Sequence, residues 1–261
     1  MLLAIDVGNT NITVGIFQRE RLISCGRMST LGPRTVDEVT ITLQGLLHNL
    51  CLGTGYRFEN IDGLILSSVV PQATSALKQA LKGLVKPRPL IVGETIRAPI
   101  KNRYRVPSQV GQDRLVNAVA AYYLYGGPAI VVDFGTAVTV DLVSKRCEYL
   151  GGLIVPGIAI SLEALVSRAA LLPKIELAPP KELLGRDTQE SMRSGIFFGY
   201  GALCDGVVSK LKTRHAPKAK VIATGGHAPL IVPYCRSVKI LNTELTLQGL
   251  RLTYDRAQKS Y

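Results

Sequence analysis

A short motif occurs twice in this chain, and each copy has the pattern of a tight turn between two strands. The first copy is IDVGNTNITVGIF at residues 5–17, and the second is VDFGTAVTVDLV at residues 132–143. Asp6 and Gly8 of the first copy recur as Asp133 and Gly135 of the second. Alternating apolar residues follow both turns, which predicts antiparallel strand pairs. The repeat therefore predicts a chain built from two copies of one domain.

The order of the apolar patterns supports this duplication. It predicts strands at 2–8, 12–18 and 21–28, a helix that begins at the capping box Thr35–Glu38, a strand at 61–70, a second helix and a strand at 89–92. After a helix at 113–125, strands follow at 129–134, 138–143 and 149–155, helices at 161–170 and 189–213, a strand at 220–223 and a helix at 246–257. We expect an α/β protein with two duplicated domains, residues 1–112 and 113–261, whose Asp-x-Gly turns face each other across a cleft.

The chemistry of these turns points to phosphate binding. Glycine lets a ligand approach the backbone, and the turn amides, with Asn9, Thr10 and Thr136, can donate hydrogen bonds to phosphate oxygens. Carboxylates beside phosphates, Asp6 and Asp133, imply a cation between them. The alternative is a pair of ordinary hairpins, since Asp and Gly are favoured in any turn. Two such turns on matching strands favour the phosphate cleft.

Charge and cysteine content limit the class of protein. The net charge is +12, and basic residues gather at 78–88, 97–105 and 210–220. These clusters carry few aromatic residues, so we expect an anionic small molecule or a solvated surface rather than nucleic acid. The longest apolar run, 151–162, is interrupted by Pro156, so no membrane span is predicted. Five scattered cysteines and an N-terminal apolar run cut short by Asp6 predict a reducing, cytoplasmic location without a signal peptide.

Eight motifs, in order along nearly the whole chain, resemble those of one family. They are IDVGNTN (5–11), SSVVP (67–71), GQDRLVNAVAAY (111–122), VDFGTAVTVD (132–141), GGLIVPGI (151–158), DTQESMRSG (187–195), ATGG (223–226) and LTLQGL (245–250). The family is type III pantothenate kinase, a branch of the superfamily of actin, sugar kinases and heat-shock chaperone ATPases. The resemblance implies two ribonuclease-H-like domains of the βββαβα type around ATP and magnesium. It also implies phosphorylation of pantothenate to 4′-phosphopantothenate, the first step of coenzyme A biosynthesis, by a homodimer.

The resemblance also assigns roles to individual residues. ATP contacts fall on Asp6, Val7, Gly8, Asn9, Thr10, Asn11, Ile12, Thr13 and Thr136, and Asp133 would hold a monovalent cation, potassium or ammonium. The G-x-D-R pantothenate motif falls on Gly111, Gln112, Asp113 and Arg114, with further substrate contacts at Tyr104 and Thr188. Asp113 would accept the proton of the substrate hydroxyl. Gln112 departs from the alanine that is frequent in the family, which affects the predicted shape of the pocket there.

Simpler interpretations of these residues remain open from the sequence. Asp113 opens a predicted helix, where Asp is a favoured N-cap. A packed ring, a solvated charge and a surface turn would account for Tyr104, Arg114 and Thr188. For the whole chain, the alternatives are a kinase of another small alcohol, a non-catalytic nucleotide-binding regulator of the same fold, and a nucleic-acid-binding protein.

Overall fold

A computed structural model of the chain describes residues 1–30 and 35–259, which form two compact units. Unit 1 comprises Met1–Lys101, Arg105–Tyr123 and Leu245–Tyr261. Unit 2 comprises Asn102–Tyr104 and Leu124–Glu244. Each unit has a sheet and a hydrophobic core of its own.

The sheet of unit 1 has five strands among the described residues, in the order β3-β2-β1-β4-β5. These strands are β1 (Leu2–Val7), β2 (Asn11–Gln18), β3 (Arg21–Ser29), β4 (Gly63–Ser68) and β5 (Leu90–Ile91). The first three form an antiparallel meander, and β4 and β5 run parallel to β1. Five of the six residues in both β1 and β4 are buried, as expected for strands covered on both faces.

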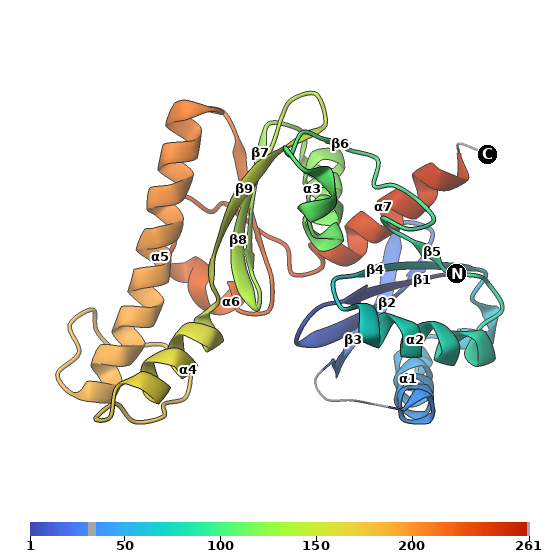
Figure 1. Ribbon diagram of the computed structural model, residues 1–261, viewed down its shortest axis with the longest axis horizontal. Helices are drawn as coiled ribbons and strands as arrows, with labels where there is room; N and C mark the ends of the chain where they lie inside the picture. The colour runs from blue at the N-terminus through green and yellow to red at the C-terminus, as the bar shows by residue number, and fades with distance from the viewer. Residues whose placement is uncertain (31–34, 260–261) are drawn as a thin grey trace. The chain divides into compact units, whose positions relative to one another are not determined.

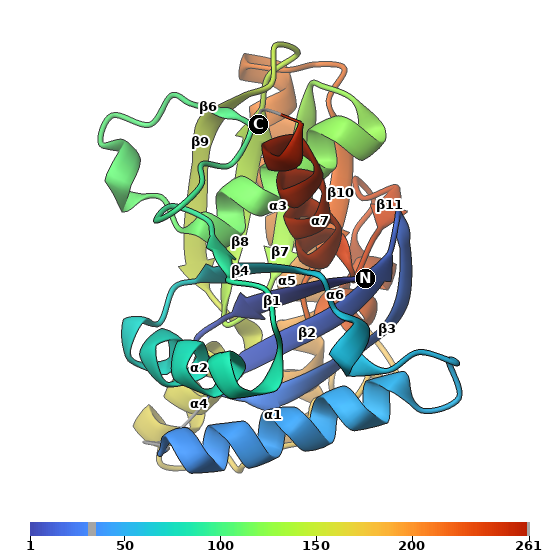
Figure 2. The ribbon, with the colours of Figure 1, turned by 90° about the vertical axis from the view of Figure 1, so that its right-hand side faces the viewer.

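Helices cover both faces of this sheet (Figures 1 and 2). On one face, α1 (Val36–Cys51) and α2 (Pro71–Leu84) bury Leu43, Leu47 and Leu77 against β1 and β2. The predicted capping box starts α1, where Thr35 Oγ1 accepts a bond from Glu38 N and Glu38 Oε2 accepts one from Thr35 N. On the other face lie α7 (Leu245–Gln258) and the first turns of α3 (Gln112–Tyr125). Two 3₁₀ turns, Phe58–Asn60 and Pro107–Gln109, lie in connections.

The sheet of unit 2 repeats the same plan. Its strands are β7 (Ala129–Phe134), β8 (Ala137–Val143), β9 (Glu148–Pro156), β10 (Lys220–Thr224) and β11 (Ile240–Leu241), and the short β6 (Lys101–Asn102) follows β9 at the edge. The order β9-β8-β7-β10-β11 matches β3-β2-β1-β4-β5, with antiparallel and parallel pairs at the same places. This match confirms the predicted α/β duplication.

One face of the unit 2 sheet is covered by α4 (Ile158–Arg168), α5 (Thr188–Arg214) and α6 (Ala228–Ile231), which is followed by the 3₁₀ turn Val232–Tyr234 (Figure 1). Phe197 and Cys204 of α5 are fully buried beside Phe134 of β7. Gly201 of α5 lies so close to the backbone of Tyr234 that a Cβ would be 2.3 Å from its carbonyl oxygen. This explains a glycine in the middle of a helix.

The compact units differ from the predicted ranges 1–112 and 113–261. Residues 113–123 and 245–259 pack with the N-terminal sheet, because α7 contacts β1, β2 and β4 and α3 contributes Val116 to the same core. A sequence pattern shows that α7 is amphipathic but not which sheet it covers. As the bounds of the two duplicated domains, the ranges 1–112 and 113–261 stay a prediction.

The sequence patterns predicted the long helices and strands but missed several short elements. The strands β6 and β11 have two residues each and α6 has four, too few for a period to show. The predicted helix at 161–170 begins three residues earlier, at Ile158. No helix in the described part of the chain is long and apolar enough to cross a membrane.

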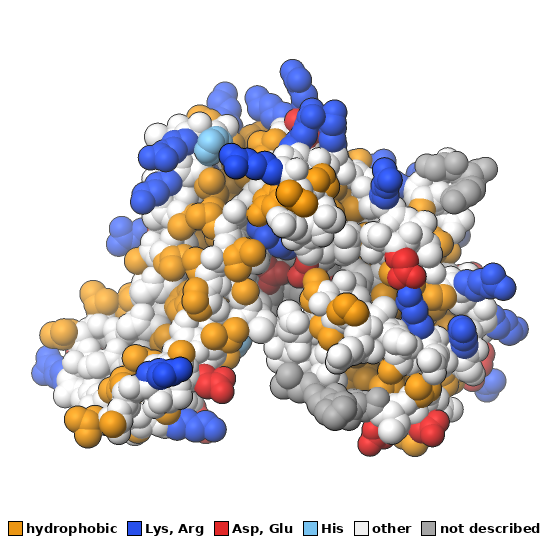
Figure 3. Space-filling view, viewed as in Figure 1, with side chains coloured by type: hydrophobic (Ala, Val, Ile, Leu, Met, Phe, Trp, Pro, Cys, Tyr) orange, Lys and Arg blue, Asp and Glu red, His pale blue; other side chains and the backbone are white. Residues whose placement is uncertain are grey.

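The surface of unit 2 is strongly basic near the C-terminal end of α5. Figure 3 shows Lys and Arg side chains gathered there and around the β8–β9 hairpin, at the top of the view. Lys210, Lys212 and Arg214 lie in the last turns of α5, and Lys218 and Lys220 follow it. The basic cluster at 210–220 is thus one continuous region of surface.

The packing of α7 gives a first testable prediction. A Cβ on Gly249 would lie 2.2 Å from the carbonyl oxygen of Val116, whereas a Cβ on exposed Gly45 of α1 would meet nothing within 4 Å. Gly249→Ala should therefore lower the free energy of unfolding by about 1–3 kcal/mol through overpacking. Gly45→Ala should raise it by about 0.5–1 kcal/mol, since alanine is the better helix former. Urea denaturation measures both, and equal effects of the two substitutions would contradict this packing.

Candidate active site

Asp6 lies at the carboxyl end of β1, in the middle of the unit 1 sheet. It pairs with Thr13 of β2 on one side and with Ser67 of β4 on the other. Ser67 is fully buried, and its Oγ donates a hydrogen bond of 2.5 Å to Asp6 Oδ1. The partly buried carboxylate is thus fixed at the carboxyl ends of the parallel strands β1 and β4, and such strand ends are the usual position of ligand sites in α/β folds.

The ionisation of Asp6 is strongly perturbed. Burial raises the pKa of this carboxyl, the nearby charge of Asp113 raises it further, and the Ser67 hydrogen bond partly opposes both; the result is a pKa of about 7. Asp113 is 107 positions away in the printed sequence. The structure therefore brings together two carboxylates that the sequence placed in separate motifs.

Asp113 is held in the first turn of α3 by its neighbours. The helix begins at Gln112, and the carbonyl of Gly111 accepts the bond from Leu115 N at 3.3 Å, so Gly111 holds the N-cap position. The alternative that Asp113 is the N-cap is therefore wrong. Its Oδ1 accepts a 2.8 Å hydrogen bond from Arg114 N. A Cβ on Gly111 would lie 2.4 Å from that oxygen, so glycine at 111 makes room for the carboxylate.

The turn between β1 and β2 exposes groups that can bind phosphate. Gly8 N donates to Asn11 O at 3.0 Å, which closes the turn, and Asn9, Thr10 and Asn11 are exposed. Val7 and Ile12 pair across the strands and are buried, and Val7 O accepts a 3.1 Å hydrogen bond from Val69 N, so the exposed part of the turn is residues 9–11. Thr13 is partly buried opposite Asp6.

The other two residues of the G-x-D-R motif face the interior of unit 1. Arg114 is buried, with 7% of its surface exposed, so the solvated-charge alternative is wrong. The side chain of Gln112 packs against Gly93, whose φ of +85° suits glycine, and a Cβ there would be 2.5 Å from Gln112 Cδ. Gln112 lines a cavity of about 420 Å³ with residues of β4, α2 and the loop after β5, among them Ser68, Lys78 and Glu94.

The second turn, in unit 2, holds Asp133 between glycines. Asp133 is the penultimate residue of β7 and pairs with Thr139 of β8 and Thr224 of β10. A Cβ on Gly225, where φ is +96°, would lie 2.4 Å from Asp133 Oδ1. Thr136 is exposed, and its carbonyl oxygen lies against Gly157, where a Cβ would be only 1.9 Å away. Backbone thus crowds this carboxylate on several sides.

His227 lies beside the second turn and was assigned no role from the sequence. Its backbone N donates to Phe134 O at 3.0 Å. Burial lowers the pKa of its imidazole, and a hydrogen bond with the Gly135 backbone partly opposes this. His227 and Ser67 are the site neighbours that sequence reasoning missed. The SSVVP motif contains Ser67, but only the strand register shows that this hydroxyl faces Asp6.

The described residues contain no group of three or more His, Cys, Asp or Glu side chains that could hold a metal ion. Each turn instead offers one carboxylate, Asp6 or Asp133. A magnesium ion is commonly held by one or two carboxylates together with substrate phosphates and water. The donor set therefore fits a cation that arrives with a phosphate ligand.

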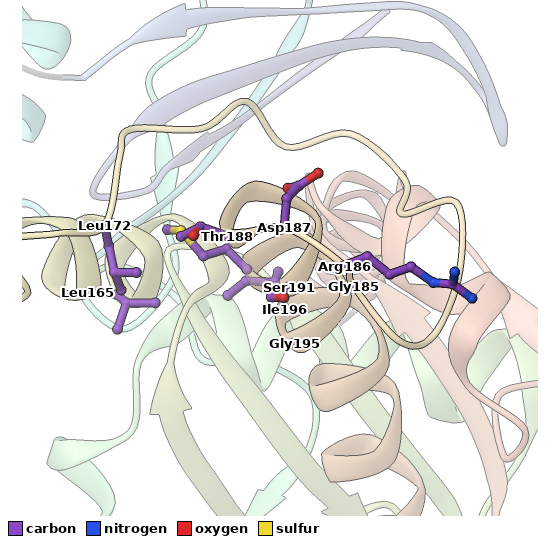
Figure 4. Close-up of a pocket in the computed structure, with 10 residues that line it drawn as sticks. Leu165, Leu172, Gly185, Arg186, Asp187, Thr188, Ser191, Gly195 and Ile196 are labelled. Carbon is purple, nitrogen blue, oxygen red and sulfur yellow. The ribbon is translucent and has the colours of Figure 1, made fainter.

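The two remaining predicted substrate contacts lie in unit 2. Tyr104 packs against Tyr149, with ring centroids 6.3 Å apart, and its backbone N donates a 3.0 Å hydrogen bond to Asn102 Oδ1. Thr188 is exposed at the first position of α5, after the N-cap Asp187. It lines a cavity of about 770 Å³ (Figure 4), where Leu165 and Leu172 lie on one side and the Arg186 guanidinium points away from them. The structure thus divides the predicted residues: Tyr104, Asp133, Thr136 and Thr188 belong to unit 2, and the others to unit 1.

The two duplicated sheets give the chain a fold that it shares with several solved structures. A solved structure described as a conserved putative Baf family transcriptional activator from Campylobacter jejuni has a TM-score of 0.62 and 19% identity, and covers 98% of this chain and 99% of its own. The activator of the 2-hydroxyisocaproyl-CoA dehydratase from Clostridium difficile, solved with bound ADPNP, has a TM-score of 0.56 and 12% identity, with 99% and 96% coverage. At these identities the likeness shows the fold alone.

The family follows from sequence comparison. The model of type III pantothenate kinase matches residues 2–210. The type III pantothenate kinase of Halalkalibacterium halodurans is 46% identical over 254 residues, which cover 97% of this chain and 98% of that protein. The chain belongs to the type III pantothenate kinase family. This confirms the predicted family and the prediction that the chain is an ATP-using kinase.

The pKa of Asp6 gives a prediction for stability. The folded state keeps the Asp6 proton up to about pH 7, whereas the unfolded chain loses it near 3.8, so the ligand-free protein should lose stability as pH rises between these values. Asp6→Asn removes this loss. At pH 8 it should raise the free energy of unfolding by up to about 4 kcal/mol, since each pKa unit corresponds to about 1.36 kcal/mol, with little effect at pH 4. Urea denaturation across pH 4–8 measures this difference in the free energy of unfolding. An Asp6→Asn variant less stable than wild type at pH 8 would contradict the raised pKa of Asp6.

Proposed function

We propose that this protein transfers the γ-phosphoryl group of ATP to the 4′-hydroxyl of pantothenate, which yields 4′-phosphopantothenate for coenzyme A biosynthesis. The observation that carries the proposal is the pair of carboxylates in unit 1, Asp6 at the end of β1 and Asp113 at the start of α3, in a member of this family. An alcohol kinase needs a base at the hydroxyl, donors for phosphate and a cation for the transferred charge. The residues of the site divide into these three roles.

Asp6 and its turn serve the nucleotide. Without a cation, burial and the nearby Asp113 raise the pKa of the Asp6 carboxyl to about 7. Magnesium, which offsets the charge of the phosphates, would be held there by Asp6. The exposed Asn9, Thr10 and Asn11 are proposed to donate to the phosphates, and Thr136 of the second turn is proposed as a further donor.

Asp113 is the proposed general base. Its carboxylate is positioned by the Arg114 amide and by the absence of a side chain at Gly111. Phosphoryl transfer passes through a loose transition state, so the hydroxyl proton leaves late and a well-placed carboxylate suffices. A cation held by Asp6 would also reduce the repulsion between the two carboxylates.

The substrate is proposed to lie against the start of α3. Pantothenate carries a carboxylate, and buried Arg114 is a cation whose guanidinium suits such a group. Gly111 gives the substrate room beside Asp113, and Gln112 shapes the adjoining wall through its contact with Gly93. Tyr104 and Thr188 are proposed as further contacts, each at the surface of unit 2.

Asp133 is proposed to bind a monovalent cation, potassium or ammonium. It is a single carboxylate that lies against Gly135 and Gly225, and a site with one negative charge suits a large monovalent ion better than a divalent ion without its own ligands. The activity also fits a reducing cytoplasm, since all five cysteines are free thiols.

A coupled ATP assay tests the function and the cation together. With magnesium and potassium, pantothenate should be turned over, and other small alcohols of similar size should react much more slowly. Replacement of potassium by sodium should lower the rate, and Asp133→Asn should remove the difference between the two salts. Turnover of another alcohol without turnover of pantothenate would transfer the assignment to that alcohol. Equal rates in both salts would remove the monovalent site.

Substitution of Asp113 tests the base. Asp113→Asn keeps the shape of the side chain but cannot accept the proton, so kcat should fall by about 10² to 10⁴-fold. The melting temperature and ATP binding should change little, because Gly111 and not Asp113 caps α3. Ser108→Ala, on the exposed 3₁₀ turn before α3, is the control and should keep full turnover. Near-normal turnover of a well-folded Asp113→Asn would exclude the catalytic role.

We also propose a homodimer. Leu171, Leu183 and Leu184, beside the cavity that contains Thr188, are exposed by 93%, 67% and 74%, and such apolar surface is commonly covered by a partner. Sedimentation at micromolar concentration should give twice the mass of the 28.2 kDa chain. Leu184→Glu should shift the equilibrium towards the monomer, since it places a charge in that surface. A fully active monomeric wild type would contradict the proposal.

A further inference from the structure

The basic end of unit 2 has no part in the proposed kinase site. Much of it comes from residues 210–220, one of the three basic clusters behind the +12 net charge. The structure places the β8–β9 hairpin, with exposed Lys145 and Arg146, beside the segment that follows α5 (Figure 3). Two basic segments far apart in the sequence therefore meet on one surface.

A cavity of about 390 Å³ opens between these two segments. The volume lies within the range of small-molecule sites. Three exposed cationic or titratable side chains, Lys145, His215 and Lys218, line it together with Ser144. The rest of the lining is apolar and consists of Pro128, Leu142, Val143, Leu150, Ala216 and Pro217.

Backbone contacts hold both walls of this cavity to the start of β7. On one side, Gly127 lies so close to the hairpin that a Cβ would be 2.4 Å from the carbonyl oxygen of Ser144. Ser144 N also donates to Glu148 O at 2.9 Å, which closes the hairpin. On the other side, Lys220 N donates to Pro128 O at 3.1 Å. The cavity is therefore formed before any ligand binds, which lowers the entropic cost of binding.

The carboxylate of the hairpin does not oppose an anion in this cavity. Glu148 Oε1 accepts two hydrogen bonds from Arg103, from Nε at 2.9 Å and from Nη2 at 2.6 Å, and Oε2 accepts one from Ser144 Oγ at 3.1 Å. The negative charge of Glu148 is thus offset by the positive charge of Arg103. The field at the cavity remains positive, with Arg146, Arg214 and Lys220 exposed nearby on the same two segments.

We propose that this cavity binds a small amphipathic anion, an apolar chain or ring that carries a terminal carboxylate or phosphate. The apolar lining would take the chain, because burial of apolar surface contributes about 25 cal/mol per Å². Lys145, His215 and Lys218 would take the oxyanion. Nucleic acid fits less well, since no aromatic side chain on which a base could stack lines the cavity.

The test uses the full-length protein without ATP or pantothenate, titrated with hexanoate and hexyl phosphate while backbone amide NMR shifts are recorded. Both anions should saturate the same signals, those of 142–150 and 215–220. Hexanol has the apolar chain without the anionic group, and inorganic phosphate has the anionic group without the chain. Both should bind several-fold more weakly. If only one of the two anions binds, the terminal group is identified as a carboxylate or as a phosphate.

Matched variants locate the binding. Lys218→Gln should weaken hexanoate binding by about three- to fivefold, as expected for an exposed charge pair. Lys239→Gln removes the same charge from an exposed site outside the cavity lining and should leave the affinity unchanged. Leu150→Glu, at a half-exposed position of the lining, should abolish binding. The proposal would be overturned if neither anion showed saturable binding, or if Lys218→Gln and Lys239→Gln weakened binding equally. Turnover of pantothenate, measured separately, tests the kinase function independently.

Discussion

The unit 1 site depends on the repulsion between two carboxylates, Asp6 and Asp113, in a poorly hydrated place. Charge on one raises the cost of charge on the other, and burial raises the pKa of Asp6 to about 7 before any ligand binds. A protein gains no stability from such an arrangement. Two close carboxylates are useful where a cation and a phosphorylated ligand bind beside them, as in a kinase, because the cation offsets their charge.

Several features of the fold position the Asp6 and Asp113 carboxylates. The parallel register of β1 and β4 sets Ser67 beside Asp6, and the helices on both faces remove water from the sheet. Gly111 makes room for the Asp113 side chain at the start of α3. In unit 2 the equivalent turn has the same strand order around it, but its carboxylate, Asp133, is enclosed by Gly135 and Gly225. The two copies of the fold thus surround their carboxylates with different neighbours.

The sequence predicted those features that have a local signature. The Asp-x-Gly turns, the capping box at Thr35 and the long helices and strands follow from periodicity and turn chemistry, and the motifs led to the family. The approach of Asp113 to Asp6 could not be predicted from patterns, because it depends on how α3 and β1 pack. The burial of Arg114 and the packing of α7 on the first sheet are tertiary facts of the same kind. Two-residue strands such as β11 carry too few residues for any period.

The most direct test of the carboxylate pair is the titration of Asp6 itself, followed by the ¹³Cγ signal of its side chain in ligand-free protein. The account predicts a midpoint near pH 7 in the wild type, well above the usual value of 3.8. In Asp113→Asn the midpoint should fall, because one of the two causes of the shift is removed, yet stay above 3.8 because burial remains. A midpoint near 3.8 in the wild type, or one that Asp113→Asn leaves unchanged, would contradict the coupling of the two carboxylates.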